Sequence, residues 1–241
     1  MPTPILLAIA LVAVYLLDSM HFLRIGEALV LTRGPRLTGL SFGGSFELGG
    51  RRPYLPNPLT PFRADFRVGW DTSGAPTEDA PLVGEAMRSH LRAVRAVGWI
   101  GSLCAIPVVI VAPLALIFGE EVIFLAAVAA AVLLAACGCL LVGVRRRALG
   151  LSGLQVCSLA FIALVCLPCS PNLARAVTAQ RKWTLAARDL PQLGFDRQRA
   201  NAVRDQILAA LSSARRYVAE ESAELKVIDE QIRALQGGCQ P

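Results

Sequence analysis

The feature that most constrains this chain is a set of four long runs without a charged side chain. They cover residues 2–17, 97–118, 122–144 and 151–169. The last three reach the length of roughly 20 residues that a helix needs to cross the hydrocarbon of a bilayer, and the first reaches it when extended to Leu23. The runs lack the alternation of barrel strands, and only helices or closed barrels satisfy the backbone in lipid. We therefore predict four transmembrane helices.

Composition supports a membrane protein over a soluble one. Apolar residues make up 54% of the 241 residues and charged residues 17%, with a mean hydropathy of +0.53. Globular proteins average about 45–50% and about 25%. These values exclude a disordered chain and a collagen. The seven cysteines are too sparse for the disulfide framework of a small secreted module.

The predicted fold class is integral membrane and mainly α-helical, with four transmembrane helices, a small β-rich segment between the first two, and a coiled-coil tail. The order of the runs divides the chain into five segments. These are an uncleaved anchor helix over 1–23, a β-rich soluble segment over 24–81, an amphipathic interfacial helix over 82–96, a three-helix transmembrane bundle over 97–170, and a C-terminal helical and coiled-coil tail over 171–241.

Three stretches in the second segment favour β-strands. Residues 28–32 form one candidate, and residues 40–48 read as a hairpin that turns at Gly43-Gly44. Residues 62–70 alternate strictly in polarity, which is typical of a half-buried strand. The alternation puts one set of side chains on a single face: Phe62, Ala64, Phe66, Val68 and Trp70.

The arginines predict the orientation of the membrane helices. The connection 119–121 carries no basic residue, whereas Arg145, Arg146 and Arg147 follow the third run, and further arginines lie within 24–96. Basic residues near span ends favour the cytoplasmic side. We therefore predict a multi-pass protein of a bacterial inner membrane, with segment 24–96 cytoplasmic and both termini periplasmic. The basic residues that follow the fourth run oppose this orientation.

An adjacent set of arginines predicts contact with lipid head groups. Arg88, Arg92 and Arg95 form a basic stripe on the helix expected over 82–96. An interfacial helix rests on anionic lipids in this way; an ordinary solvated face is the alternative. Basic and acidic residues are interspersed in both soluble segments, so we expect a bilayer partner and no nucleic acid.

The tail carries the most regular pattern in the chain. Seam positions recur at alternating spacings of four and three residues, and all but the charged Glu221 are apolar. This is a heptad pattern and predicts a coiled coil, in which Glu221 could set the register. Self-association or a helical protein partner would cover this seam, and packing on the protein's own tail or sheet is the alternative. The seam consists of Ile207, Leu211, Ala214, Val218, Glu221, Leu225, Ile228, Ile232 and Leu235.

The cysteines offer the one candidate for chemistry. Cys166-Leu-Pro-Cys169 is a C-x-P-C pair at the end of the fourth run, and such pairs exchange disulfides in thiol oxidoreductases. Membrane thiol oxidoreductases with four spans are similar to this chain only in span count and this spacing. A helix end gives the wrong dipole for a reactive thiolate. Cys239 is a possible third participant, and packing as small apolar residues is the alternative for the pair.

The remaining motifs favour packing over catalysis. Cys137 and Cys139 fall in a stripe of small residues typical of helix contact in lipid, so we expect no metal site, and no cofactor motif is present. Asp18 and His21 lie on one face at the edge of the first run.

We predict a non-enzymatic scaffold, or assembly and accessory subunit, that acts through its tail. The alternatives are a thiol–disulfide oxidoreductase that uses Cys166 and Cys169, and an accessory subunit of a transporter.

Overall fold

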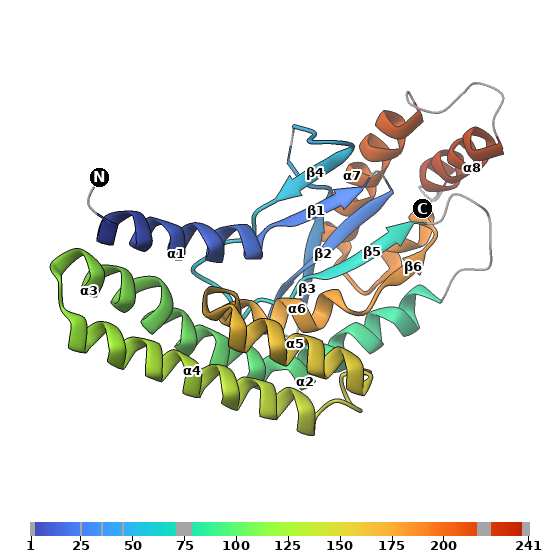
Figure 1. Ribbon diagram of the computed structural model, residues 1–241. Coiled ribbons are helices and arrows are strands. Elements are labelled where there is room, and N and C mark those ends of the chain that lie inside the picture. Colours follow the sequence, from blue (N-terminus) through green and yellow to red (C-terminus); the bar gives the residue numbers. More distant parts are fainter. Residues whose placement is uncertain are drawn as a thin grey trace. The chain divides into compact units, whose positions relative to one another are not determined.

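The computed structural model describes residues 3–24, 26–34, 36–44, 46–70, 79–215 and 223–237 (Figure 1). The chain divides into two compact units, each assembled from three separate segments of the sequence. The first unit takes Met1–His21, Leu55–Ala64 and His90–Arg181, and the second takes the remainder.

The first unit is helical. Helix α1 packs beside α3, and α4 packs beside both α3 and α5 (Figure 1). Gly119, at a left-handed φ of 75°, ends α3, and a capping box between Ser152 and Gln155 starts α5. The helices of this unit are α1 (Thr3–Ser19), the later part of α2 (Ala80–Ala105), the π-helix η1 (Ile106–Val111), α3 (Ala112–Phe118), α4 (Glu121–Val144), α5 (Gly153–Val165), the 3₁₀ helix η2 (Leu167–Asn172) and α6 (Leu173–Ala179).

The prediction of four transmembrane helices is wrong. Within the described residues, only Ala80–Phe118 and Glu121–Val144 are long and apolar enough to cross a membrane. Helix α1 has 17 residues because the chain enters strand β1 (His21–Arg24), where Leu23 is buried. Helix α5 has 13 residues because Pro168 and Pro171 follow its end, and the chain there tightens into η2.

Helix α2 is longer than the sequence predicted. It runs without a break from Ala80 to Ala105, so the segment expected over 82–96 and the start of the run over 97–118 lie in one helix. The apolar face is as expected: Val83, Met87, Leu91 and Val94 are all buried. A continuous helix of this kind belongs to both units, its first ten residues to the second and the rest to the first.

The second unit is built on a four-stranded sheet in the order β3-β2-β5-β6 and a two-stranded sheet of β1 and β4. Strand β2 pairs antiparallel with β3 and β5, and β5 pairs in parallel with β6. Ala28, Val30, Phe66 and Val68 form the buried centre of the larger sheet. Its strands are β2 (Glu27–Arg33), β3 (Arg36–Ser41), β5 (Phe66–Trp70) and β6 (Trp183–Leu185), and β4 covers Arg51–Tyr54.

Two of the three expected strands differ from the sequence prediction in their ends. Residues 28–32 lie in β2 as expected. The alternation over 62–70 becomes strand only from Phe66, and Phe62 is 43% exposed. The tight turn lies at Gly49 and Gly50, both at positive φ, where Leu48 and Arg51 exchange two backbone hydrogen bonds.

In the described part of the tail, several helices packed on one another stand in place of the single coiled-coil helix that was expected. The tail forms the 3₁₀ helix η3 (Ala187–Gln192), α7 (Arg197–Arg215) and α8 (Ala223–Gly237). Helices α7 and α8 pack on each other and on η3, and Arg215 bridges to Asp229 at 3.1 Å. Seam residues Ile207, Leu211 and Ile228 are at most 2% exposed. A heptad spacing specifies one apolar face, and that face can be buried inside the protein's own unit as well as against a partner helix.

Candidate functional site

The C-x-P-C pair forms a disulfide. The Sγ atoms of Cys166 and Cys169 are bonded, and both residues are half-buried. Cys166 is the C-terminal cap of α5, and the amide of Cys169 donates to its carbonyl at 2.8 Å. The pair therefore lies at a helix C-terminus, as the sequence predicted, where the dipole disfavours a thiolate.

The other described cysteines do not join this pair. Cys104 is buried, with its Sγ 3.0 Å from the hydroxyl of Ser170, the residue after Cys169. Cys137 is exposed and Cys139 half-buried on α4. Among the described residues, no group of three or more His, Cys, Asp or Glu is placed to hold a metal ion. Cys239 lies outside the described residues.

The predicted head-group arginines have different surroundings. Arg92 and Arg95 are exposed. Arg88 is half-buried, and its Nη1 donates to the carbonyl of Leu193 at 3.3 Å within the second unit. Two of the three side chains thus remain available to a lipid surface, whereas Arg88 is bound to its own protein.

The other seam residues that the structure describes are half-buried or buried. Leu225 and Ile232 are half-buried, and Ala214 and Leu235 are buried. Val218 and Glu221 lie outside the described residues. The described part of the seam therefore faces mainly the interior of the second unit.

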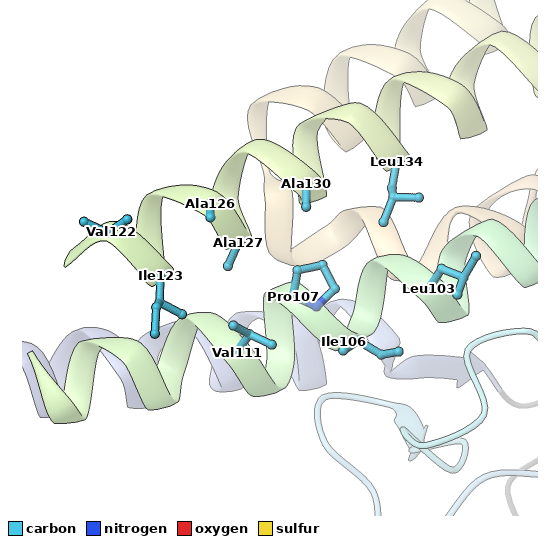
Figure 2. Close-up of a pocket in the computed structure, with 10 residues that line it drawn as sticks. All are labelled: Leu103, Ile106, Pro107, Val111, Val122, Ile123, Ala126, Ala127, Ala130 and Leu134. Atoms are coloured by element: carbon cyan, nitrogen blue, oxygen red, sulfur yellow. The ribbon is translucent and has the colours of Figure 1, made fainter. Parts of the chain in front are cut away.

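A shallow groove runs between η1 and α4, and the sequence analysis did not identify it (Figure 2). It encloses about 530 Å³ and has an almost wholly apolar wall. Pro107 projects toward the alanines of α4 in the close-up (Figure 2). Ala126 and Ala130 are exposed along this side of α4, whereas Ala127 is buried. The lining residues are Leu103, Ile106, Pro107, Val111, Val122, Ile123, Ala126, Ala127, Ala130 and Leu134.

A second cavity, of about 350 Å³, lies between α1, the loop over 55–64 and the α2–η1 region. Phe62 and Trp99 stack in its wall with ring centroids 5.8 Å apart and planes 12° from parallel. Its two hydroxyls are already bonded: Tyr15 donates to the carbonyl of Pro58, and Ser102 donates to that of Gly98. The lining side chains come from Val12, Tyr15, Leu16, Pro58, Leu59, Pro61, Phe62, Trp99, Ser102, Ala105, Ile106, Val109 and Ile110.

A buried polar network holds the loop of this cavity in place. Arg175 is 2% exposed, and its guanidinium donates to the carbonyl oxygens of Asn57 and Thr60, both at 3.0 Å, and of Arg63 at 3.4 Å. It also donates to Asn172 Oδ1 at 3.2 Å. One arginine thus satisfies carbonyls from three positions of the loop, which a neutral side chain cannot do.

The network continues from Asn172 into α1. Its Nδ2 donates to the carboxylate of Asp18 at 2.9 Å, and the hydroxyl of Ser19 contacts its Oδ1 at 3.1 Å. Burial raises the pKa of Asp18, while the bond from Asn172 and the charge of Arg175 oppose the shift. The sequence placed Asp18 at the edge of an apolar run but gave no sign of the role of Arg175, because the loop carbonyls that Arg175 binds are more than 110 residues away.

The chain was also compared with known proteins. No protein-family model matches it, and no curated protein or solved structure is significantly similar to it.

Proposed function

We propose that this protein is a membrane-anchored assembly or accessory subunit, held in the bilayer by a hairpin of Ala80–Phe118 and Glu121–Val144. The exposure of these two helices carries the proposal. Only 39% and 28% of their most apolar stretches are buried, whereas the core helix of a soluble protein is mostly buried. Ile110, Ile117 and Leu133 are 49–67% exposed, and such a continuous apolar surface marks contact with lipid or another protein.

Charge supports one orientation for the hairpin. Its tip, Gly119 to Glu121, has two acidic residues and no basic one, while Arg92 and Arg95 lie in the first half of Ala80–Phe118 and the run Arg145 to Arg147 follows Val144, all away from the tip. The positive-inside rule then favours cytoplasmic ends and an outer tip. In this arrangement the protein belongs to an inner membrane, and the exposed arginines lie where anionic head groups attract them.

The groove between η1 and α4 supports the assembly role. It lies on the two helices proposed to be in lipid, so only lipid chains or another transmembrane helix can reach it there. Ala126 and Ala130 are exposed on α4, and small residues let a second helix approach closely. A helix of another subunit is the occupant we propose. This surface replaces the tail seam, most of whose described residues are buried.

Site-specific photo-crosslinking in native membranes tests the assembly role. A photoreactive residue at Ala130 is expected to capture another polypeptide, and the mass of the product tells a second copy from a different protein. The neighbouring exposed position Ala129 does not line the groove and serves as the matched control. Ala126→Leu fills the groove and should reduce capture from position 130 at least fivefold. Equal capture from both positions, or capture of lipid alone, would contradict the proposal.

A second candidate function, thiol–disulfide exchange, rests on the Cys166–Cys169 bond. Its loop spans four residues, for which chain entropy gives a stabilisation of only about 2 kcal/mol. In the reaction, a substrate dithiol attacks the bond, a mixed disulfide forms, and the second substrate thiol releases both cysteines as thiols. The substrate loses two electrons and two protons, which the pair gains, and a small disulfide reoxidises the pair.

Alkylation separates exchange from a static bond. The full-length protein is incubated in buffers with increasing ratios of reduced to oxidised dithiol. Cys166 and Cys169 are expected to become alkylatable thiols together as this ratio rises, and oxidised glutathione should reverse the change. The substitutions Cys137→Ser and Cys157→Ser remove the two exposed free thiols among the described residues, whose alkylation would otherwise add a background signal. A bond that stays closed in the native protein, and opens only after unfolding, would exclude this function.

A further inference from the structure

The cavity of about 350 Å³ between α1, the loop over 55–64 and the α2–η1 region has the properties of a lipid-chain site. We propose that it holds one acyl chain of a bilayer phospholipid. The proposal rests on the membrane placement given above and assigns a ligand that the assembly role does not require. The cavity is within the size range of ligand sites, about 300–1,000 Å³.

The chemistry of the wall favours hydrocarbon. Aliphatic and aromatic side chains make up most of the lining, with the stacked rings of Phe62 and Trp99 on one side. The hydroxyls of Tyr15 and Ser102 both donate to backbone carbonyls of the protein. Their hydroxyl protons therefore need no acceptor from an occupant of the cavity. A methylene chain meets this wall without leaving a polar group of its own unpaired.

The position of the opening identifies the source of the chain. Ile106 and Ile110 line the cavity and are also 50% and 52% exposed on the outer surface of η1. Both belong to the longer of the two helices that can cross a membrane. The cavity therefore opens where the surrounding medium is lipid. A helix with side chains is about 10–12 Å across, too wide for a cavity of this volume, so a single chain is the fitting occupant.

Two features indicate that the cavity is preformed. Arg175 fixes the loop through three carbonyl oxygens, and Tyr15 ties α1 to the same loop at Pro58. The wall on the α2 side is a six-residue π-helix, a rare conformation that appears frequently at functional sites. A cavity held open from both sides avoids the entropic cost of ordering on binding.

Photolabelling in vesicles tests the proposal. The full-length protein is reconstituted in phosphatidylcholine vesicles that contain a mixture of phospholipids with a diazirine at different positions along one acyl chain, so that the probe samples the full depth of the hydrocarbon. Tyr15 is 2% exposed and lines the cavity, whereas Phe118 is 73% exposed on α3. We expect label on both residues, because the bulk lipid reaches Phe118 and only a chain inside the cavity reaches Tyr15.

Filling the cavity provides the control. Ala105→Phe, or the smaller Ala105→Leu, should reduce labelling of Tyr15 at least tenfold and leave Phe118 unchanged. Ala129→Phe adds the same bulk at an exposed position of α4 that lines neither the cavity nor the groove, and it should change neither. Circular dichroism and thermal unfolding confirm that each variant is folded.

The outcomes separate the two proposals. Label on Phe118 without label on Tyr15, or label on Tyr15 that persists in both Ala105 variants, would overturn the lipid-chain site and leave the membrane anchor intact. Label on neither residue would overturn the membrane anchor as well.

Discussion

The guanidinium of Arg175 fixes the loop over residues 55–64 by bonding to three of its carbonyl oxygens. A buried cation is costly unless its donors are satisfied, and here Asn172 and the loop carbonyls satisfy them. The charge of Arg175 also reaches Tyr15 and Asp18, where it opposes the rise in pKa that burial causes. Arg175 therefore holds the loop in position and also affects the protonation of Tyr15 and Asp18 in α1.

Arg175→Leu is expected to lower the free energy of unfolding by about 3 kcal/mol, because the loop carbonyls lose their donors in a buried position. Arg147→Leu, at an exposed arginine of the same unit, should change it by less than about 0.5 kcal/mol. Denaturant unfolding in detergent measures both. Equal stability of the two variants would show that the loop does not depend on Arg175.

Asp18 predicts a pH dependence of stability. Its pKa is raised by burial, so the folded protein binds the proton more tightly than the unfolded chain does. Ionisation of Asp18 therefore lowers the free energy of unfolding. This loss of stability develops as the pH rises from the ordinary pKa of 3.8 through the raised pKa, and it is absent at pH values below 3.8. Asp18→Asn should remove that part of the pH dependence of the midpoint of thermal unfolding. A variant whose pH profile overlays that of the wild type would contradict the assignment.

At the scale of secondary-structure elements, glycines on α2 set how closely other segments approach. A Cβ at Gly101 would lie 2.5 Å from the carbonyl oxygen of Pro171 in η2, whereas a Cβ at Gly143 on α4 would meet nothing nearer than 3.9 Å. Real Cβ atoms do not tolerate the first distance, and the neighbour is backbone that cannot rotate away. The contact between α2 and η2 thus depends on a glycine.

Gly101→Ala is expected to destabilise the protein by about 1–3 kcal/mol through overpacking. Gly143→Ala is the matched substitution on another apolar helix and should be neutral or stabilise by up to about 1 kcal/mol, since alanine favours helix. Thermal unfolding of both variants in the same detergent checks the difference. A stable Gly101→Ala variant would mean that α2 and η2 are not in close contact.

The elements also show what can be predicted from the sequence. The runs over 97–118 and 122–144 were identified because length and hydropathy are local properties, and both lie in helices long enough to cross a membrane. The first and fourth runs were overestimated because an uncharged run does not reveal where Leu23 joins a strand or where Pro168 ends a helix. Strand β6 was missed because its three residues gain their strand character from β5, more than 110 residues earlier.

At the scale of the whole molecule, the cavity and its network could not be predicted. The cavity draws on α1, a loop and the α2–η1 region, and periodicity along one segment contains no information about such distant partners. The tail seam illustrates the same limit, because its spacing correctly indicated an apolar face while its partner turned out to be η3 and the neighbouring tail helix. The cysteine pair was found because its two members are three residues apart.

The proposed function depends most on the hairpin of Ala80–Phe118 and Glu121–Val144 crossing a bilayer with both outer ends on one side. Cysteine accessibility measures this directly, with Glu120→Cys at the tip and Ala148→Cys beyond α4, each in a background whose native cysteines are alanine. We predict that a membrane-impermeant maleimide labels position 120 in intact cells and position 148 only after permeabilisation. Labelling of both positions from the same side would contradict the account.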